Sequence, residues 1–141
     1  MKKILLFAPG FDPAFKGGGP IKSLKNLAEY LSHNYDVYVF TRNLDIDKTI
    51  LEGVVSDKWI KKDGYNVLYS SSSQYFYNLK QLSKCNGGFD LVYFNSFFNL
   101  KFTLIPLLFL NLKFKTLIAT RGEFCNEELE KKKEKKSFFL F

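Results

Sequence analysis

The run Gly17-Gly18-Gly19-Pro20 has the composition of a turn that could bind an anion. Without Cβ atoms, the three glycines can adopt positive φ and can approach a ligand closely. Pro20 suits the first turn of a helix, whose unpaired backbone amides would face that ligand. With Lys16 and Lys22 nearby, the turn is a candidate site for a phosphate or a polar sugar. The alternative is that the glycines only shape the turn and that each lysine is a surface charge.

A second cluster, Asn95-Ser96-Phe97-Phe98, offers an amide, a hydroxyl and two aromatic rings. Sugars are commonly bound by such groups, because the polar tips bond to hydroxyls while the rings cover apolar C–H faces. The alternative is that Phe97 and Phe98 belong to the core and that Asn95 and Ser96 cap a helix.

A third cluster is Thr120-Arg121-Gly122-Glu123-Phe124. The planar guanidinium of Arg121 could bind a phosphate or a carboxylate through two hydrogen bonds. Gly122 permits close backbone approach, and Glu123 could accept a substrate hydroxyl or act as a base. The alternative is an Arg121–Glu123 pair that only fixes the loop.

Each of these clusters follows an apolar run that predicts a buried β-strand. Helical spacing of apolar residues from Ile21 to about Ser32 predicts a helix between the first two strands. Such strand-helix-strand units favour a doubly wound, mostly parallel α/β sheet with helices on both faces. In that fold, ligands bind beyond the carboxyl ends of the strands. The predicted strands are 4–8, 37–40, 90–94 and 116–119.

The remaining elements are less directly tied to the clusters. Asp63-Gly64 predicts a two-residue turn between the arms 58–61 and 66–69 of a hairpin, whose second arm joins the sheet. Further helices are expected over 74–84 and over 102–112, the latter apolar nearly all round with Pro106 near its start or kinking it. A charged helix over 127–136 precedes the apolar end 138–141.

Length and composition predict one folded domain over residues 1–141, with 46% hydrophobic and 25% charged residues. The formal net charge of +7 comes largely from Lys131–Lys136. Such a run could attract nucleic acid or an anionic membrane, although it is more often a solvated helix face. Cys85 and Cys125, without a secretory signal, suggest reduced thiols in the cytoplasm. The longest apolar stretch is too short to span a membrane.

Several familiar signatures do not occur in the sequence. Neither the dinucleotide motif G-x-G-x-x-G nor the P-loop motif is present. This disfavours a dinucleotide dehydrogenase and a P-loop nucleotidase. The single histidine, His33, cannot assemble a His-based triad or a His-rich metal site. We therefore expect no metal and no bound cofactor.

Taken together, these motifs resemble the N-terminal half of the bacterial retaining glycosyltransferases of group 1, also called family 4, which build cell-surface polysaccharides such as capsule and O-antigen. Their architecture is called GT-B. The resemblance runs through nearly the whole chain. It rests on the opening Lys3-Ile4-Leu5-Leu6, the Gly-Gly-Pro loop with Ser23 after it, Trp59 on the hairpin, Asn95-Ser96-Phe97-Phe98, and Arg121-Gly122-Glu123-Phe124.

The resemblance implies a Rossmann-like domain that forms one half of a GT-B fold and binds the acceptor. Gly18 and Gly19 would approach the donor diphosphate or the transferred sugar. Asn95, Ser96, Arg121 and Glu123 would line the acceptor half of the cleft. The substrates implied are a nucleotide-sugar donor and a glycan or lipid-linked acceptor, with possible peripheral contact with the inner face of the plasma membrane and no role for nucleic acid.

Two departures from the family pattern matter. Many relatives place a histidine where this chain has Asn95, so the catalytic residue stays unassigned. The donor-binding domain, with its paired glutamates, is not among these 141 residues, so we expect the fragment to be inactive alone. The alternative function is a non-catalytic basic module that uses Lys131–Lys136 to bind an anionic membrane or nucleic acid.

Overall fold

A computed structural model describes residues 1–84, 88–110 and 114–121. The described elements follow the predicted order closely. In chain order they are β1 (Lys3–Phe7), α1 (Gly19–Ser32), β2 (Asp36–Arg42), β3 (Trp59–Lys62), β4 (Tyr65–Ser70), α2 (Tyr75–Ser83), β5 (Leu91–Phe94), the π-helical turn η1 (Leu100–Leu104), α3 (Ile105–Phe109) and β6 (Lys115–Ile118).

The strands form one six-stranded sheet in the order β3-β4-β2-β1-β5-β6. Five strands pair in parallel, and only β3 at the edge is antiparallel to its neighbour β4. Since β1 lies between β2 and β5, the strand order reverses at β1, as in Rossmann-like folds. The predicted mostly parallel α/β fold is confirmed.

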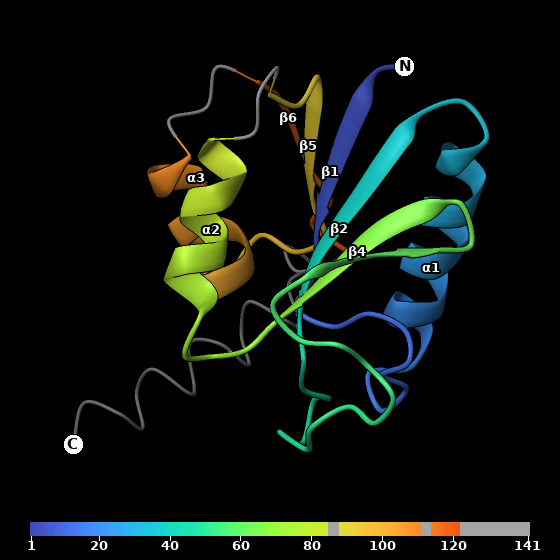
Figure 1. The fold of residues 1–141 in the computed structure, drawn as a ribbon, viewed down its shortest axis with the longest axis vertical. Coiled ribbons are helices and arrows are strands. Elements are labelled where there is room, and N and C mark those ends of the chain that lie inside the picture. The colour runs from blue at the N-terminus through green and yellow to red at the C-terminus, as the bar shows by residue number, and fades with distance from the viewer. Residues whose placement is uncertain (85–87, 111–113, 122–141) are drawn as a thin grey trace.

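Helices cover both faces of this sheet. Alternate residues of a strand point to opposite faces, so Leu6 belongs to the buried cluster that includes Leu24 of α1, while Leu5 belongs to the one that includes Leu79 of α2. Figure 1 shows α1 on one side of the strands, and α2 with α3 on the other. The continuous apolar run of β1 is therefore explained by burial on both faces.

The predicted hairpin is also present. Asp63 and Gly64 have φ values of 46° and 89°, the positive values that a tight two-residue hairpin turn requires. Trp59 pairs in register with Leu68, and its ring meets Tyr38 edge-on at 5.2 Å between centroids. This aromatic contact holds the edge strand against the sheet.

The prediction of a single apolar helix over 102–112 is wrong. The chain instead makes the π-helical turn η1 and then the short helix α3. Pro106 has no N–H to donate, and it lies in the first turn of α3, where none is needed. Just before it, the Ile105 N–H bonds to the Leu100 carbonyl, five residues back, so the turn is wide. Leu108 is 86% exposed, so this segment is not buried all round.

None of the described helices has the length and apolar character needed to span a bilayer. Several predictions fall on residues outside the described ranges. These are the helix over 127–136, the apolar end 138–141, the basic run Lys131–Lys136, the thiols of Cys85 and Cys125, and the site residues Gly122 and Glu123.

Candidate functional site

A cleft of about 390 Å³ lies at the carboxyl edge of the sheet, where the strand order reverses. We call it the switch-point cleft. Ligands of open α/β sheets characteristically bind at this position, because the loops after neighbouring strands diverge to opposite faces there. Its lining comes from the loops that follow β1, β2 and β5 and from the start of α1: Pro9, Gly10, Gly17, Pro20, Ile21, Arg42, Asp45, Ile46, Asn95 and Asn99.

Asn95 and Arg121 meet beside this cleft. The Arg121 Nε donates a hydrogen bond of 3.0 Å to Asn95 Oδ1, and its Nη1 donates one of 3.2 Å to Ser23 Oγ. Asn95 is nearly buried, and the Tyr93 hydroxyl donates to the same Oδ1 at 3.4 Å. Arg121 thereby joins the carboxyl ends of β5 and β6 to the first turn of α1.

The alternatives raised for the Asn95 cluster do not describe the structure. The helical turn after β5 is capped by Asn99, whose Oδ1 accepts from the Phe102 N–H at 2.9 Å, and not by Asn95 or Ser96. Phe97 is half-buried and Phe98 is exposed, so neither is a core residue. The Ser96 carbonyl accepts from the Thr103 hydroxyl, and Ser96 is not among the residues lining the cleft.

The three glycines of the run Gly17-Gly18-Gly19 do not line the same pocket. Gly17 lines the switch-point cleft, whereas Gly18, Gly19 and Lys22 line a different pocket of about 550 Å³ beside α1. A Cβ on Gly17 would stand 2.7 Å from Cδ1 of Ile21, so that side chain would have to shift to admit one. The structure brings Gly17 to the same cleft as Asn95, but it places Lys22 elsewhere.

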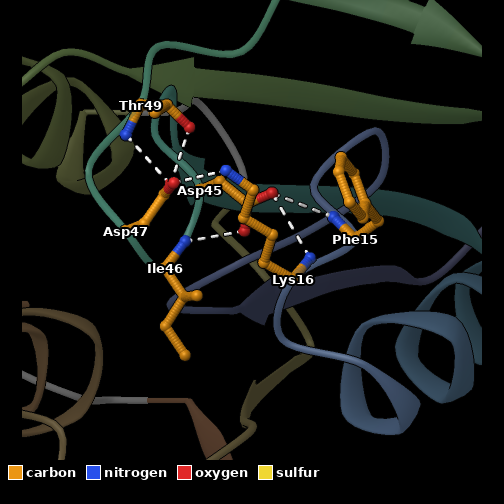
Figure 2. A network of polar contacts seen from close by, with 6 residues as sticks. All are labelled: Phe15, Lys16, Asp45, Ile46, Asp47 and Thr49. Atoms are coloured by element: carbon orange, nitrogen blue, oxygen red, sulfur yellow. Dashed lines mark hydrogen bonds and ion pairs between the residues drawn. The ribbon is translucent and has the colours of Figure 1, made fainter.

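Asp45, which the sequence reading did not single out, fixes the wall of the cleft (Figure 2). Its Oδ2 accepts from the backbone N–H groups of Phe15 and Lys16 at 3.1 and 3.3 Å, and its Oδ1 accepts from that of Ile46 at 2.6 Å. Burial alone would raise the pKa of Asp45, but these amide hydrogen bonds outweigh it and hold the pKa below its usual value. One carboxylate therefore ties the glycine loop to the loop after β2.

An ion pair also holds the same two loops together at the surface. Lys16 pairs with Asp47, whose Oδ1 also accepts from the Thr49 hydroxyl at 2.7 Å (Figure 2). The hydrogen bond from Lys16 holds the pKa of Asp47 far below its usual value. Lys16 is thus engaged with its own protein and not placed to receive a ligand.

The first half of the glycine loop is anchored to the helix α1 and to the hairpin. Asp12 forms ion pairs with Lys25, at 3.3 Å, and with Lys62, and its carbonyl accepts from the Tyr69 hydroxyl. The loop that joins β1 to α1 is therefore fixed along its length before any ligand arrives.

Besides Asp45, the polar cleft residues Arg42 and Asn99 were missed by sequence reasoning. Arg42 is the last residue of β2, so the rule that directs attention to strand ends would have found it. Asn99 could have been found as the polar residue before an apolar helical stretch. Within the described residues, no cluster of three or more histidine, cysteine or acidic side chains could hold a metal ion.

The fold and the cleft define a Rossmann-like α/β domain with a cleft at the carboxyl edge of its parallel strands. Comparisons of the chain with protein-family models, with curated proteins and with solved structures gave no match.

Proposed function

We propose that this chain is the acceptor-binding domain of a retaining glycosyltransferase and that the switch-point cleft binds the sugar of the acceptor. One observation carries the proposal. Asn95 and Arg121, which belong to two of the three motif loops, are hydrogen-bonded beside a cleft whose wall includes Gly17 of the third loop. The likeness of the motifs to the glycosyltransferase family supports the same assignment.

The chemistry of the cleft suits a saccharide. A volume of about 390 Å³ falls in the range of small-molecule sites. The side chains of Asn95 and Asn99 supply amide groups for sugar hydroxyls, and Pro9 and Ile21 supply apolar surface for C–H faces. Because Arg121 and Tyr93 both donate to Asn95 Oδ1, the amide is held in one orientation before the ligand binds.

In this proposal the domain holds and orients the acceptor hydroxyl, which lowers the entropic cost of the transfer step. A second, donor-binding domain facing the cleft would hold the nucleotide-sugar. No described residue is assigned as the catalytic base.

The test is a titration of the ¹⁵N-labelled chain with a panel of neutral saccharides and lipid-linked acceptors. Binding should shift the amide signals of Gly17 and Asn95 and the Arg121 Nε–H signal. Asn95→Ala removes one hydrogen-bonding amide and should weaken binding by about three- to tenfold. Asn34→Ala, at the exposed turn after α1, is the matched control and should bind like the wild type.

The proposal fails if no saccharide moves these signals, or if Asn95→Ala binds as tightly as the control. A nucleotide-sugar that shifts the same signals more strongly than any acceptor would also contradict it, since the cleft would then be a donor site.

A further inference from the structure

A second cleft, of about 470 Å³, adjoins the first at the carboxyl ends of β2 and β4. We call it the Arg42 cleft, because Arg42 and Asn99 line both clefts and form the boundary between them. Its remaining lining comes from the loop after β2, from the serine-rich loop before α2 and from η1: Leu44, Lys48, Ser70, Ser71, Ser72, Tyr75, Leu100, Lys101 and Phe102.

The guanidinium of Arg42 is half-buried without an acidic partner. Its Nε donates to the Leu44 carbonyl at 3.1 Å, and among the described residues no carboxylate lies within ion-pairing distance of it. Burial lowers the pKa of Arg42, and the negative charge of Asp45 only partly offsets this effect. A guanidinium withdrawn from water with its charge only partly offset is costly, and a bound anion would relieve that cost.

The surrounding charges have the same sign. Lys48 and Lys101 also line the Arg42 cleft, and none of its described lining residues is acidic. Asp57, which lies behind the serine loop, already accepts from the Ser71 N–H at 2.8 Å and from Asn78 Nδ2 at 2.6 Å. The cleft therefore concentrates positive charge, of which the nearby Asp45 offsets only a part at Arg42.

The pocket beside α1 makes a useful contrast. It contains Lys22 and Lys25, but Asp12 and Glu29 line it too, and Lys25 forms ion pairs with both of them. The charge of Lys25 is thus neutralised from within that pocket, whereas the lysines of the Arg42 cleft have no such partners in the described residues.

We propose that Arg42, together with Lys48 and Lys101, binds an oxyanion, either a phosphate or a carboxylate, on a ligand whose neutral part occupies the switch-point cleft. A guanidinium can bond two oxygens of such a group through two parallel hydrogen bonds from two nitrogens, a planar geometry that the single nitrogen of a lysine cannot match. The assignment of this oxyanion to a sugar acceptor rests on the proposed function. The binding of an oxyanion at Arg42 is independent of that function.

The test uses methyl phosphate, glucuronate and the uncharged methyl glucoside as probes of the ¹⁵N-labelled chain. At low salt, an oxyanion should shift the Arg42 Nε–H signal and the amides of Ser71 and Ser72, and added salt should weaken its binding. Response to methyl phosphate alone identifies a phosphate ligand, response to glucuronate alone identifies an acidic sugar, and response to both identifies a general oxyanion site. Each of these outcomes supports the proposal, and no response at Arg42 to either anion overturns it.

Arg42→Gln should weaken anion binding about tenfold or more, since it removes a charge-assisted hydrogen-bond donor. Arg42→Lys should give an intermediate affinity, because it keeps the charge and loses the second donor. Lys80→Gln, on the exposed face of α2, removes one charge away from the cleft and should bind like the wild type. Equal affinities for wild type and Arg42→Gln, or equal losses in Arg42→Gln and Lys80→Gln, overturn the proposal.

If Arg42→Gln does not fold, Lys101→Gln tests the proposal instead. The side chain of Lys101 is exposed, so its replacement should not affect folding. It should weaken anion binding about threefold, and no change overturns the proposal. Methyl glucoside distinguishes the two proposals, because it carries no anion. A shift of the Asn95 signal on its addition tests the proposed function alone. Either site can therefore fail while the other stands.

Discussion

At the scale of single residues, the buried Asp45 positions other residues of the cleft and has no chemical role of its own there. Its carboxylate accepts three backbone hydrogen bonds, two from the glycine loop and one from its own loop. Because each oxygen is satisfied by the protein, Asp45 is a positioning residue. It holds Gly17 and Ile46, which lie on different loops, around one cleft.

The lowered pKa of Asp45 predicts a specific dependence of stability on pH. A carboxyl group with a folded-state pKa below its unfolded value stabilises the fold at neutral pH, and this contribution is lost as the pH falls below about 4. Asp45→Asn should therefore be less stable than the wild type at neutral pH, and the difference should shrink in acid.

Urea unfolding at a series of pH values measures this difference. Glu52→Gln, in the same loop and exposed, controls for the loss of one negative charge. A gap between wild type and Asp45→Asn that stays constant down to the lowest pH would show that the ionised carboxylate is not what ties the loops together.

At the scale of elements, the start of α1 explains why a run of glycines precedes the helix. Gly18 is the N-cap residue, with φ 66° and ψ −135°, a conformation that residues with a Cβ rarely adopt. Its carbonyl accepts from the Ile21 N–H at 3.2 Å and begins the helical pattern. Gly19, one residue later, has open space around its would-be Cβ. The backbone conformation thus favours glycine at position 18, whereas neither conformation nor space requires it at position 19.

This difference predicts opposite outcomes for two adjacent substitutions. Gly18→Ala should lower the free energy of unfolding by about 1–3 kcal/mol, because the side chain is strained at that φ and ψ. Gly19→Ala should be neutral or stabilise by up to about 1 kcal/mol, since it restricts the unfolded chain without a clash. Urea unfolding compares the two variants directly. Equal losses in both would mean that the helix does not begin where the structure places it.

At the scale of the whole molecule, stability depends on two cores that share one sheet. Leu5 and Leu6 are adjacent and fully buried in β1, yet they belong to different clusters, one under α2 and one under α1. Neighbouring residues of the central strand therefore link the packing of the two faces, as Val39 and Phe40 do in β2. Disruption of either face should weaken the whole sheet.

Leu5→Ala and Leu6→Ala should each lower the free energy of unfolding by about 2–5 kcal/mol, because each leaves a cavity in a fully buried position. Leu108→Ala, at a position that is 86% exposed, should change it by no more than about 0.5 kcal/mol.

Far-UV circular dichroism and Trp59 fluorescence should report the same urea midpoint within each variant, as expected for cooperative unfolding. Separate midpoints for the two probes in either leucine variant would show that the two faces unfold independently.

Local patterns in the sequence were enough to predict the fold class and most element positions. The apolar runs of the strands, the helical spacing after Ile21 and the Asp63-Gly64 turn all depend on residues close together in the chain, where backbone and burial preferences act directly. The end of each strand could be located in the same way. This is why Gly17 and Asn95 were named as site residues, and both line the cleft.

The details of the site depended on contacts between distant segments. Arg121 reaches Ser23 across 98 residues of sequence, and Asp45 reaches Phe15 across 30. Hydrogen bonds of this kind leave no periodic trace in the sequence, because each partner is one polar residue among many. The sequence alone thus determined a Rossmann-like sheet with its polar clusters at the strand ends. Only the tertiary structure decided which of those residues meet, because their meeting depends on how the loops pack against one another.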